Sequence, residues 1–198
     1  MGSYIGIGFV YDTVSRSRIE KILESIVRYL LSKNGKITYI KFSKDKDGNQ
    51  WTEITLDNNA EMELFYEKIT KGYYGQINLL CDLFNKTGIK TILRINNLHD
   101  NYFDFLLDIP EEQIIETHST SYLNLITEKI IRFMLDAYRL TNFDYAVCDN
   151  EVEIKYSPTE IKLMNKKLYS IALFPSEDKK VRVFTSDCHI DGLTKRIT

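Results

Sequence analysis

Residues 119–154 constrain the fold most, because they combine a long amphipathic helix with a following strand. From Tyr122 onward, large apolar residues recur at spacings of three and four, which places them on one helical face. Burying such a face is worth on the order of ten kcal/mol as an upper bound, so this helix must pack against the rest of the chain. The residues expected on the buried face are Tyr122, Leu125, Ile126, Ile130, Phe133, Met134 and Ala137.

The segment after this helix, residues 143–156, is predicted to be a strand. Side chains of a strand alternate between its two faces, so the sequence separates an apolar set from an acidic set. The expected inward set is Ala146, Cys148, Val152 and Ile154. The carboxylates of Asp149, Glu151 and Glu153 are then expected to form a row on the opposite face.

The rest of the chain alternates short strands with helices. Strands are predicted at residues 4–11, 36–44, 51–56, 76–84, 89–96, 102–109, 168–174 and 181–185. Helices are predicted at residues 19–30 and 58–71, and the polar final residues are expected to fray. This pattern predicts an α+β fold, a largely antiparallel β-sheet with about three helices packed on it. Residues 1–198 form either a single domain or two packed halves, residues 1–72 and 73–198.

The first strand has two unlike faces. Ile5, Ile7 and Phe9 alternate with Gly6 and Gly8. Because glycine has no side chain, we expect another segment to pack closely against the glycine face of this strand.

Composition excludes several classes of protein. No run of about eighteen apolar residues occurs, so a membrane span is not predicted. Cys81, Cys148 and Cys188 are odd in number and widely spaced, which is typical of reduced thiols in a cytoplasmic protein. We therefore expect a cytoplasmic protein that does not act at a membrane.

The net charge of −2 conceals an uneven distribution. Residues 100–160 hold 4 basic and 13 acidic side chains, whereas the segments on either side carry a net positive charge. An acidic block of this size argues against nucleic-acid binding there and favours a basic protein partner.

The acidic strand leaves three interpretations open. As catalytic or metal-binding groups, Asp149, Glu151 and Glu153 would have to converge, whereas alternate positions on a strand point in parallel. They can also form a solvated face that needs no special role. As a docking surface they would bind a partner with a basic cleft, and further acidic residues strengthen this interpretation. The residues that would join them are Asp144, Asp104 and Asp108, and Asp100 belongs to the same acidic region of the sequence.

Catalytic and cofactor motifs do not emerge from the sequence. Gly6 and Gly8 lie within a strand and lack the third glycine of a dinucleotide-binding turn, so no cofactor is predicted. His99, His118 and His189 have no partner at the spacing of a metal site, and we expect surface histidines without a metal. The sequence therefore predicts that the protein is not an enzyme.

The long helix and three stretches carry a resemblance to a known family, and the stretches are MGSYIGIGFVYD, YFDFLLDIPEEQI and FDYAVCDNEVEI. The chain resembles immunity proteins of bacterial polymorphic-toxin systems, and among them it is similar to the immunity protein sixty-four family. The resemblance implies a protein that neutralises a cognate toxin by stoichiometric binding, which blocks the toxin's active site or substrate entry. The alternative is a small-molecule-binding regulatory domain, in which a deep pocket would contain convergent polar groups.

Overall fold

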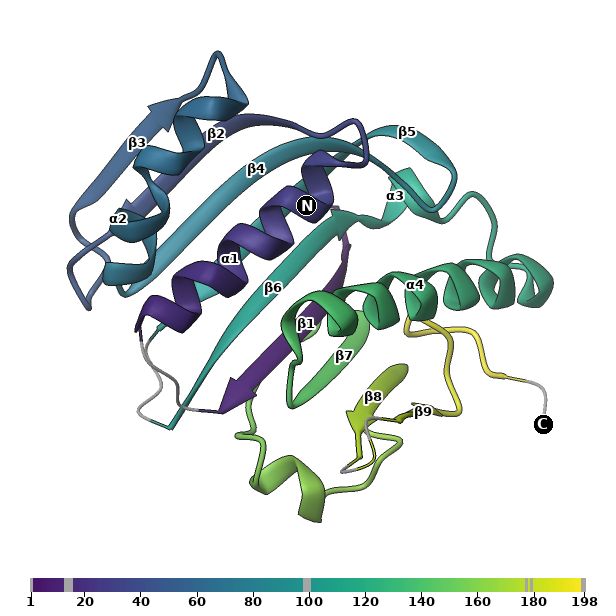
Figure 1. Cartoon of the computed structure of the whole chain (residues 1–198). Coiled ribbons are helices and arrows are strands. Elements are labelled where there is room, and N and C mark those ends of the chain that lie inside the picture. The colour runs from purple at the N-terminus through teal and green to yellow at the C-terminus, as the bar shows by residue number, and fades with distance from the viewer. Residues whose placement is uncertain (1, 13–15, 98–100, 177, 179, 197–198) are drawn as a thin grey trace.

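The computed structural model describes residues 2–12, 16–97, 101–176, 178 and 180–196, and its strands and helices follow one another as Figure 1 shows. The strands are β1 (Tyr4–Asp12), β2 (Lys36–Ser43), β3 (Trp51–Thr55), β4 (Tyr74–Leu83), β5 (Lys86–Asn96), β6 (Tyr102–Pro110), β7 (Tyr145–Asn150), β8 (Ile171–Pro175) and β9 (Val181–Thr185). The helices are α1 (Arg16–Leu31), α2 (Tyr66–Lys71), α3 (Glu111–Ile114) and α4 (Thr120–Thr141), with 3₁₀ turns η1 (Asn59–Leu64) and η2 (Glu160–Leu163).

The strands of the described chain form one nine-stranded sheet in the order β3-β2-β4-β5-β6-β1-β7-β8-β9. Each neighbouring pair is antiparallel, which confirms the predicted α+β fold with a largely antiparallel sheet. The amino-terminal strand β1 lies inside the sheet, where Ile7 faces Leu107 of β6 and Cys148 of β7. Residues 1–72 and 73–198 therefore both contribute strands to the same sheet.

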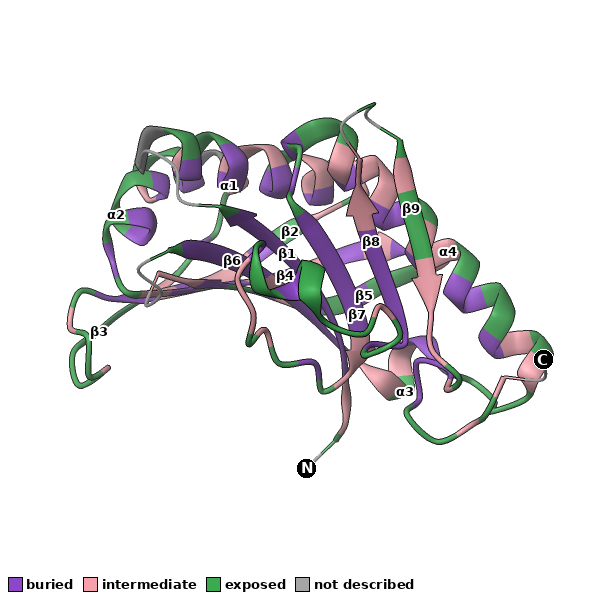
Figure 2. Ribbon diagram, turned by 90° about the horizontal axis from the view of Figure 1, so that it is seen from below, coloured by how far each residue is buried: buried purple, intermediate pink, exposed green. Residues whose placement is uncertain are grey.

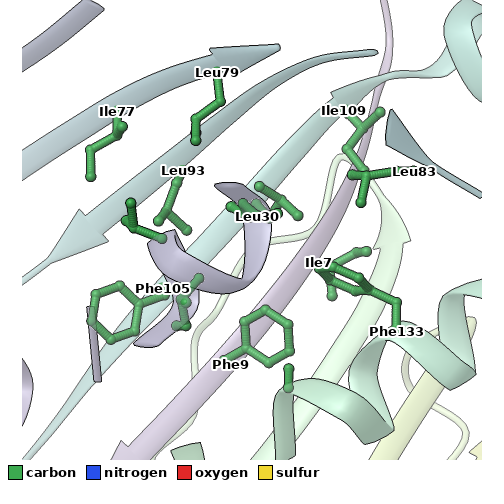
Figure 3. Close-up of a cluster of buried hydrophobic side chains, with 14 of the residues drawn as sticks. Ile7, Phe9, Leu30, Ile77, Leu79, Leu83, Leu93, Phe105, Ile109 and Phe133 are labelled. Atoms are coloured by element: carbon green, nitrogen blue, oxygen red, sulfur yellow. The ribbon is translucent and has the colours of Figure 1, made fainter. Parts of the chain in front are cut away.

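Helices α1, α2 and α4 lie on the same side of the sheet (Figure 2), and the main core fills the space between these layers. Strand residues that point toward the helices include Ile7, Phe9, Leu93 and Phe105. Figure 3 shows them in one buried cluster with Leu30 of α1 and Phe133 of α4. Alternation along each strand produces this face, and the opposite set of side chains points away from the helices. We call the side away from the helices the second face of the sheet.

Helix α4 has the predicted length, but its buried stripe is rotated from the expected one. Leu123 is fully buried, whereas Leu125 is 47% exposed, so the predicted burial of Leu125 is wrong. Successive residues of a helix are about 100° apart, which places Leu125 nearly opposite Leu123. Ile126, Ile130, Phe133, Met134 and Ala137 are buried as predicted.

The predicted strand at residues 143–156 is wrong in its second half. Strand β7 ends at Asn150, and Glu151 has a φ of 47°, a left-handed conformation that turns the chain away from the sheet. Val152 and Ile154 then pack against Gly6 and Gly8 on the second face, not in the main core. The close packing expected on the glycine face of β1 is therefore confirmed, and the chain that provides it is this segment.

Residues 186–196 pack on the sheet, so the prediction that the final residues fray is wrong for this part, and residues 197–198 lie outside the described residues. A β-bridge joins Cys188 to Lys195, and His189 and Ile190 are fully buried. The hydroxyl of Ser170 lies 2.6 Å from Asp149 Oδ1 and 3.0 Å from the carbonyl oxygen of His189, which ties the segment to the start of β8.

Candidate functional site

A ridge formed by residues 151–169 crosses the second face of the sheet beneath β6, β1 and β7. The hydroxyl of Tyr145 donates to the carbonyl of Tyr156, and the hydroxyl of Tyr169 donates to the carbonyl of Glu153 at 3.1 Å. Ile161 of η2 is 2% exposed and belongs to a small apolar cluster between the ridge and the strands. These contacts fix the ridge firmly on the sheet.

A first hollow of about 490 Å³ lies between the ridge and strands β2 to β6. Its wall includes Trp51 and Tyr74, whose ring centroids are 6.0 Å apart, and Lys41 Nζ lies 4.8 Å from the Trp51 ring centroid. The other lining residues are Gly75, Gln76, Arg94, Ile95, Asn96, Asp104, Leu106, Val152, Glu153, Ile154 and Lys155. The hollow thus combines an aromatic wall with charged groups of both signs.

Two buried carboxylates, Asp104 and Asp108, lie on the second face of β6, with Leu106 between them. Asp104 is 4% exposed, and burial raises its pKa to about 7. Burial also raises the pKa of Asp108, to about 6, although the guanidinium of Arg94 lies 2.9 Å away and opposes this shift. The carboxyl of Asp104 therefore holds its proton to a much higher pH than an exposed Asp does, and its protonated form can donate a hydrogen bond.

Among the described residues that line the first hollow, none is a His, Cys or Ser. These residues therefore do not form a nucleophile with an imidazole base. Aromatic rings, cations and carboxylates on a rigid wall are instead suited to binding.

A second hollow of about 570 Å³ lies on the other side of the ridge, against β8 and β9. Phe174 and Phe184 pack edge to face, and Lys166 Nζ lies 4.5 Å from the Phe174 ring centroid. Other residues lining this hollow are Asp144, Lys162, Pro175, Ser176, Asp178 and Arg182. Its character is aromatic and predominantly basic.

The structure does not bring the six acidic residues predicted to bind a partner onto one surface, and Asp100 lies outside the described residues. Because the chain turns at Glu151, the predicted row of Asp149, Glu151 and Glu153 on one strand is wrong. Glu151 and Glu153 are exposed on the ridge, and Glu153 pairs with Lys155. Asp149 is half-buried beside Ser170.

The remaining three acidic residues lie elsewhere on the second face. Asp104 and Asp108 are buried near the first hollow, so they are not the exposed groups that a docking surface was expected to present. Asp144 is exposed, accepts a hydrogen bond from the Asp12 amide at 2.8 Å and lines the second hollow. The sequence contains a sign that Asp104 and Asp108 are buried. Both alternate with apolar residues on β6 and lie on the same side of the sheet as the glycines of β1, where another segment packs.

Sequence reasoning did not single out the cations and apolar residues of the second face, Lys41, Arg94, Lys162, Leu163 and Arg182. The sequence places Trp51 only within a predicted strand, residues 51–56. Its place beside Tyr74 depends on the pairing of β2 with both β3 and β4, which places Trp51 and Tyr74 on either side of Ser43.

The histidines occupy unlike environments. His118 Nδ1 lies 2.9 Å from Asp191 Oδ2, and His189 is buried, with its pKa lowered by burial and by Arg196. The prediction of surface histidines is therefore wrong for His189, and His99 lies outside the described residues. Within the described ranges, no group of three or more His, Cys, Asp or Glu residues is arranged to hold a metal ion.

The helices were also compared with the requirements for crossing a bilayer. None of the helices in the described parts of the chain combines the length and apolar character that a membrane-spanning helix needs.

The chain was compared with known proteins and families. No curated protein matches it. Among solved structures, the Pseudomonas aeruginosa T6SS protein PA0821 is similar with a TM-score of 0.38 and 7% sequence identity, over 75% of this chain and 41% of that chain. The chain thus spans less than half the length of that protein. The model of the family Imm64, described as immunity protein 64, matches residues 1–196. The match covers nearly the whole sequence, and the chain therefore belongs to the immunity protein 64 family.

Proposed function

We propose that this protein binds a cognate bacterial toxin and neutralises it by forming a stoichiometric complex, without catalysis of its own. The observation that carries this proposal is the family match over residues 1–196. Binding blocks the toxin's active site or the entry of its substrate. Since an immunity protein protects the cell that makes the toxin, we place this action in the cytoplasm.

The second face of the sheet supplies the geometry for such binding. It carries a fixed ridge between two hollows of about 490 and 570 Å³, and aromatic and charged side chains line both. Rigid aromatic and Arg side chains in partly enclosed positions are the residues that most often dominate protein interfaces. We therefore propose the second face as the toxin-binding side.

The exposed members of the acidic set contribute to this proposal. Glu151 and Glu153 protrude from the base of the ridge, where they would meet a basic cleft of the toxin and speed its association. Replacing both by Lys is expected to lower the association rate at low salt, with a smaller effect at high salt. Asp149 is left intact in this test because it hydrogen-bonds Ser170.

Adding the purified protein stepwise to the toxin tests whether it neutralises the toxin by forming a stoichiometric complex. The cognate toxin would be assayed against its own substrate at increasing amounts of the purified protein. A stoichiometric inhibitor abolishes activity at one equivalent, and the two proteins elute together in size-exclusion chromatography. Persistent toxin activity in the presence of excess protein, with no complex, would refute the proposal.

The first hollow favours a second candidate function, the binding of a small molecule. Its volume lies in the range of ligand pockets, and Asp104 and Arg94 bring polar groups to an aromatic wall. Trp51, the sole tryptophan of the sequence, lines this hollow, so its fluorescence reports on occupancy. A metabolite that shifts this emission in a saturable way would support this function. Calorimetry should then show that the Trp51→Phe variant still binds the same metabolite. Unchanged emission across a metabolite panel would count against it.

A further inference from the structure

The tip of the ridge presents large apolar side chains to solvent. Leu163 is 86% exposed, Met164 is 37% exposed and Leu168 is 44% exposed, all within six residues at and after η2. Single exposed apolar residues are ordinary on protein surfaces, but several close together indicate an interaction site. The neighbouring Ile161 is 2% exposed, so the same turn places one apolar side chain inside the protein and others outside.

Hydrogen bonds hold this tip in one conformation. The Glu160 carboxylate accepts from both the amide and the hydroxyl of Ser157 at 2.8 Å, which closes the start of the turn. Lys166 Nζ donates to the carbonyls of Ile161 at 3.1 Å and Lys162 at 2.9 Å, which closes its end. An apolar anchor that is already ordered loses little conformational entropy when it binds.

The surroundings of the tip are positively charged. Lys162, Lys166 and Arg182 line the second hollow, together with the rings of Phe174 and Phe184. Although Asp144 and Asp178 line the same hollow, Asp178 is already paired with Lys180 at 3.0 Å. The local charge therefore has the opposite sign to that expected from the acidic middle third of the sequence, and it complements an acidic partner surface.

We infer that the ridge tip and the second hollow form the anchoring contact with the toxin. Leu163 and Met164 enter an apolar depression on the toxin, and carboxylates at the border of that depression pair with Lys162 and Arg182. This inference rests on the proposed function and deepens it. It specifies a second contact, apart from the basic cleft that Glu151 and Glu153 would meet: an acidic surface of the toxin with an apolar centre.

The test measures the dissociation constant between the purified protein and a catalytically inactive form of its cognate toxin. Leu163→Ser and the double variant Lys162→Glu/Arg182→Glu are each expected to weaken binding by about tenfold or more. The matched control is Leu125→Ser, an exposed leucine on α4 at the helix side of the sheet. It is expected to bind as the wild type does, and unfolding temperatures confirm that all variants fold.

The outcomes separate the two claims. If the wild type binds the toxin and Leu163→Ser binds equally well, the ridge tip is not the anchor, and the proposed function stands. If the wild type does not bind the toxin, both the proposed function and this inference fail. If toxin affinity is unchanged but Leu163→Ser abolishes binding to phosphatidylserine vesicles, the tip contacts a membrane and the inference is overturned.

Discussion

Replacing Gly6 by Ala tests how closely the ridge packs on the sheet. A β-carbon at this position would overlap Val152 Cγ1 and would lie 3.3 Å from Leu106 Cδ1 and 3.4 Å from Asp108 Oδ1. Overpacking of this kind costs about 1–3 kcal/mol, whereas the loss of backbone freedom in the unfolded chain returns about 0.4–1 kcal/mol. We therefore expect Gly6→Ala to lower the free energy of unfolding by about 1–2 kcal/mol.

The neighbouring glycine provides a matched comparison. At Gly8 the new β-carbon would lie 2.6 Å from Ile154 Cδ1, the far end of a flexible side chain that can rotate away. Ile154 Cγ1 also lies 3.0 Å from this carbon, but two side-chain torsions can move both atoms, whereas Val152 has only the stiff χ1 torsion, so relief at Gly6 needs a less favourable rotamer or a shift of the ridge. Gly8→Ala is accordingly expected to destabilise the protein less than Gly6→Ala does.

A double-mutant cycle with Val152→Ala measures this contact directly, using urea denaturation followed by circular dichroism. Val152→Ala removes the overlapping methyl group, so the double variant is expected to be more stable than the sum of single effects by about 1 kcal/mol or more. Additivity within about 0.5 kcal/mol would refute the reasoning, because the two side chains would then not share one space.

Two further predictions concern the buried polar groups of the second face. Because burial raises the pKa of Asp104 from 3.8 to about 7, the folded protein holds a proton that the unfolded chain releases. The free energy of unfolding should therefore fall between about pH 4 and pH 7, by about 4 kcal/mol at most, and Asp104→Asn should flatten this decline in denaturation curves recorded across that range. In the Asp104→Asn variant, Asp108 still causes a smaller fall of the free energy of unfolding with rising pH, because its pKa is also raised. A free energy of unfolding that rises over this pH range in the wild type would contradict the raised pKa of Asp104. Ser170→Ala should lower the free energy of unfolding by about 1–3 kcal/mol, because Asp149 loses a buried hydrogen-bond partner. Since the Ser170 hydroxyl also bonds the His189 carbonyl, amide hydrogens of residues 188–196 should exchange faster in this variant. Unchanged protection would show that Ser170 does not hold this segment in place.

The sequence by itself determined the fold class and most of the strands and helices, although not the end of β7. The three- and four-residue spacing of apolar side chains specified α4, because a helical face of that size is stable only when buried. Alternation within β1, β2 and β6 specified strands, since each has one face toward the helices. These signals are local, and each depends only on residues within a few positions of one another.

The site depended on contacts that local patterns do not contain. The acidic residues of β7 and the ridge alternate in sequence, yet one left-handed residue, Glu151, sends the chain across Gly6 and separates their carboxylates. Whether a carboxylate is exposed follows from what packs over it: the ridge covers the part of the second face that includes Asp104, whereas Glu153 protrudes. The sequence therefore determined which acidic residues alternate with apolar ones. Only the tertiary structure decided which of these acidic residues a partner can reach, because solvent exposure depends on chain segments far apart in sequence.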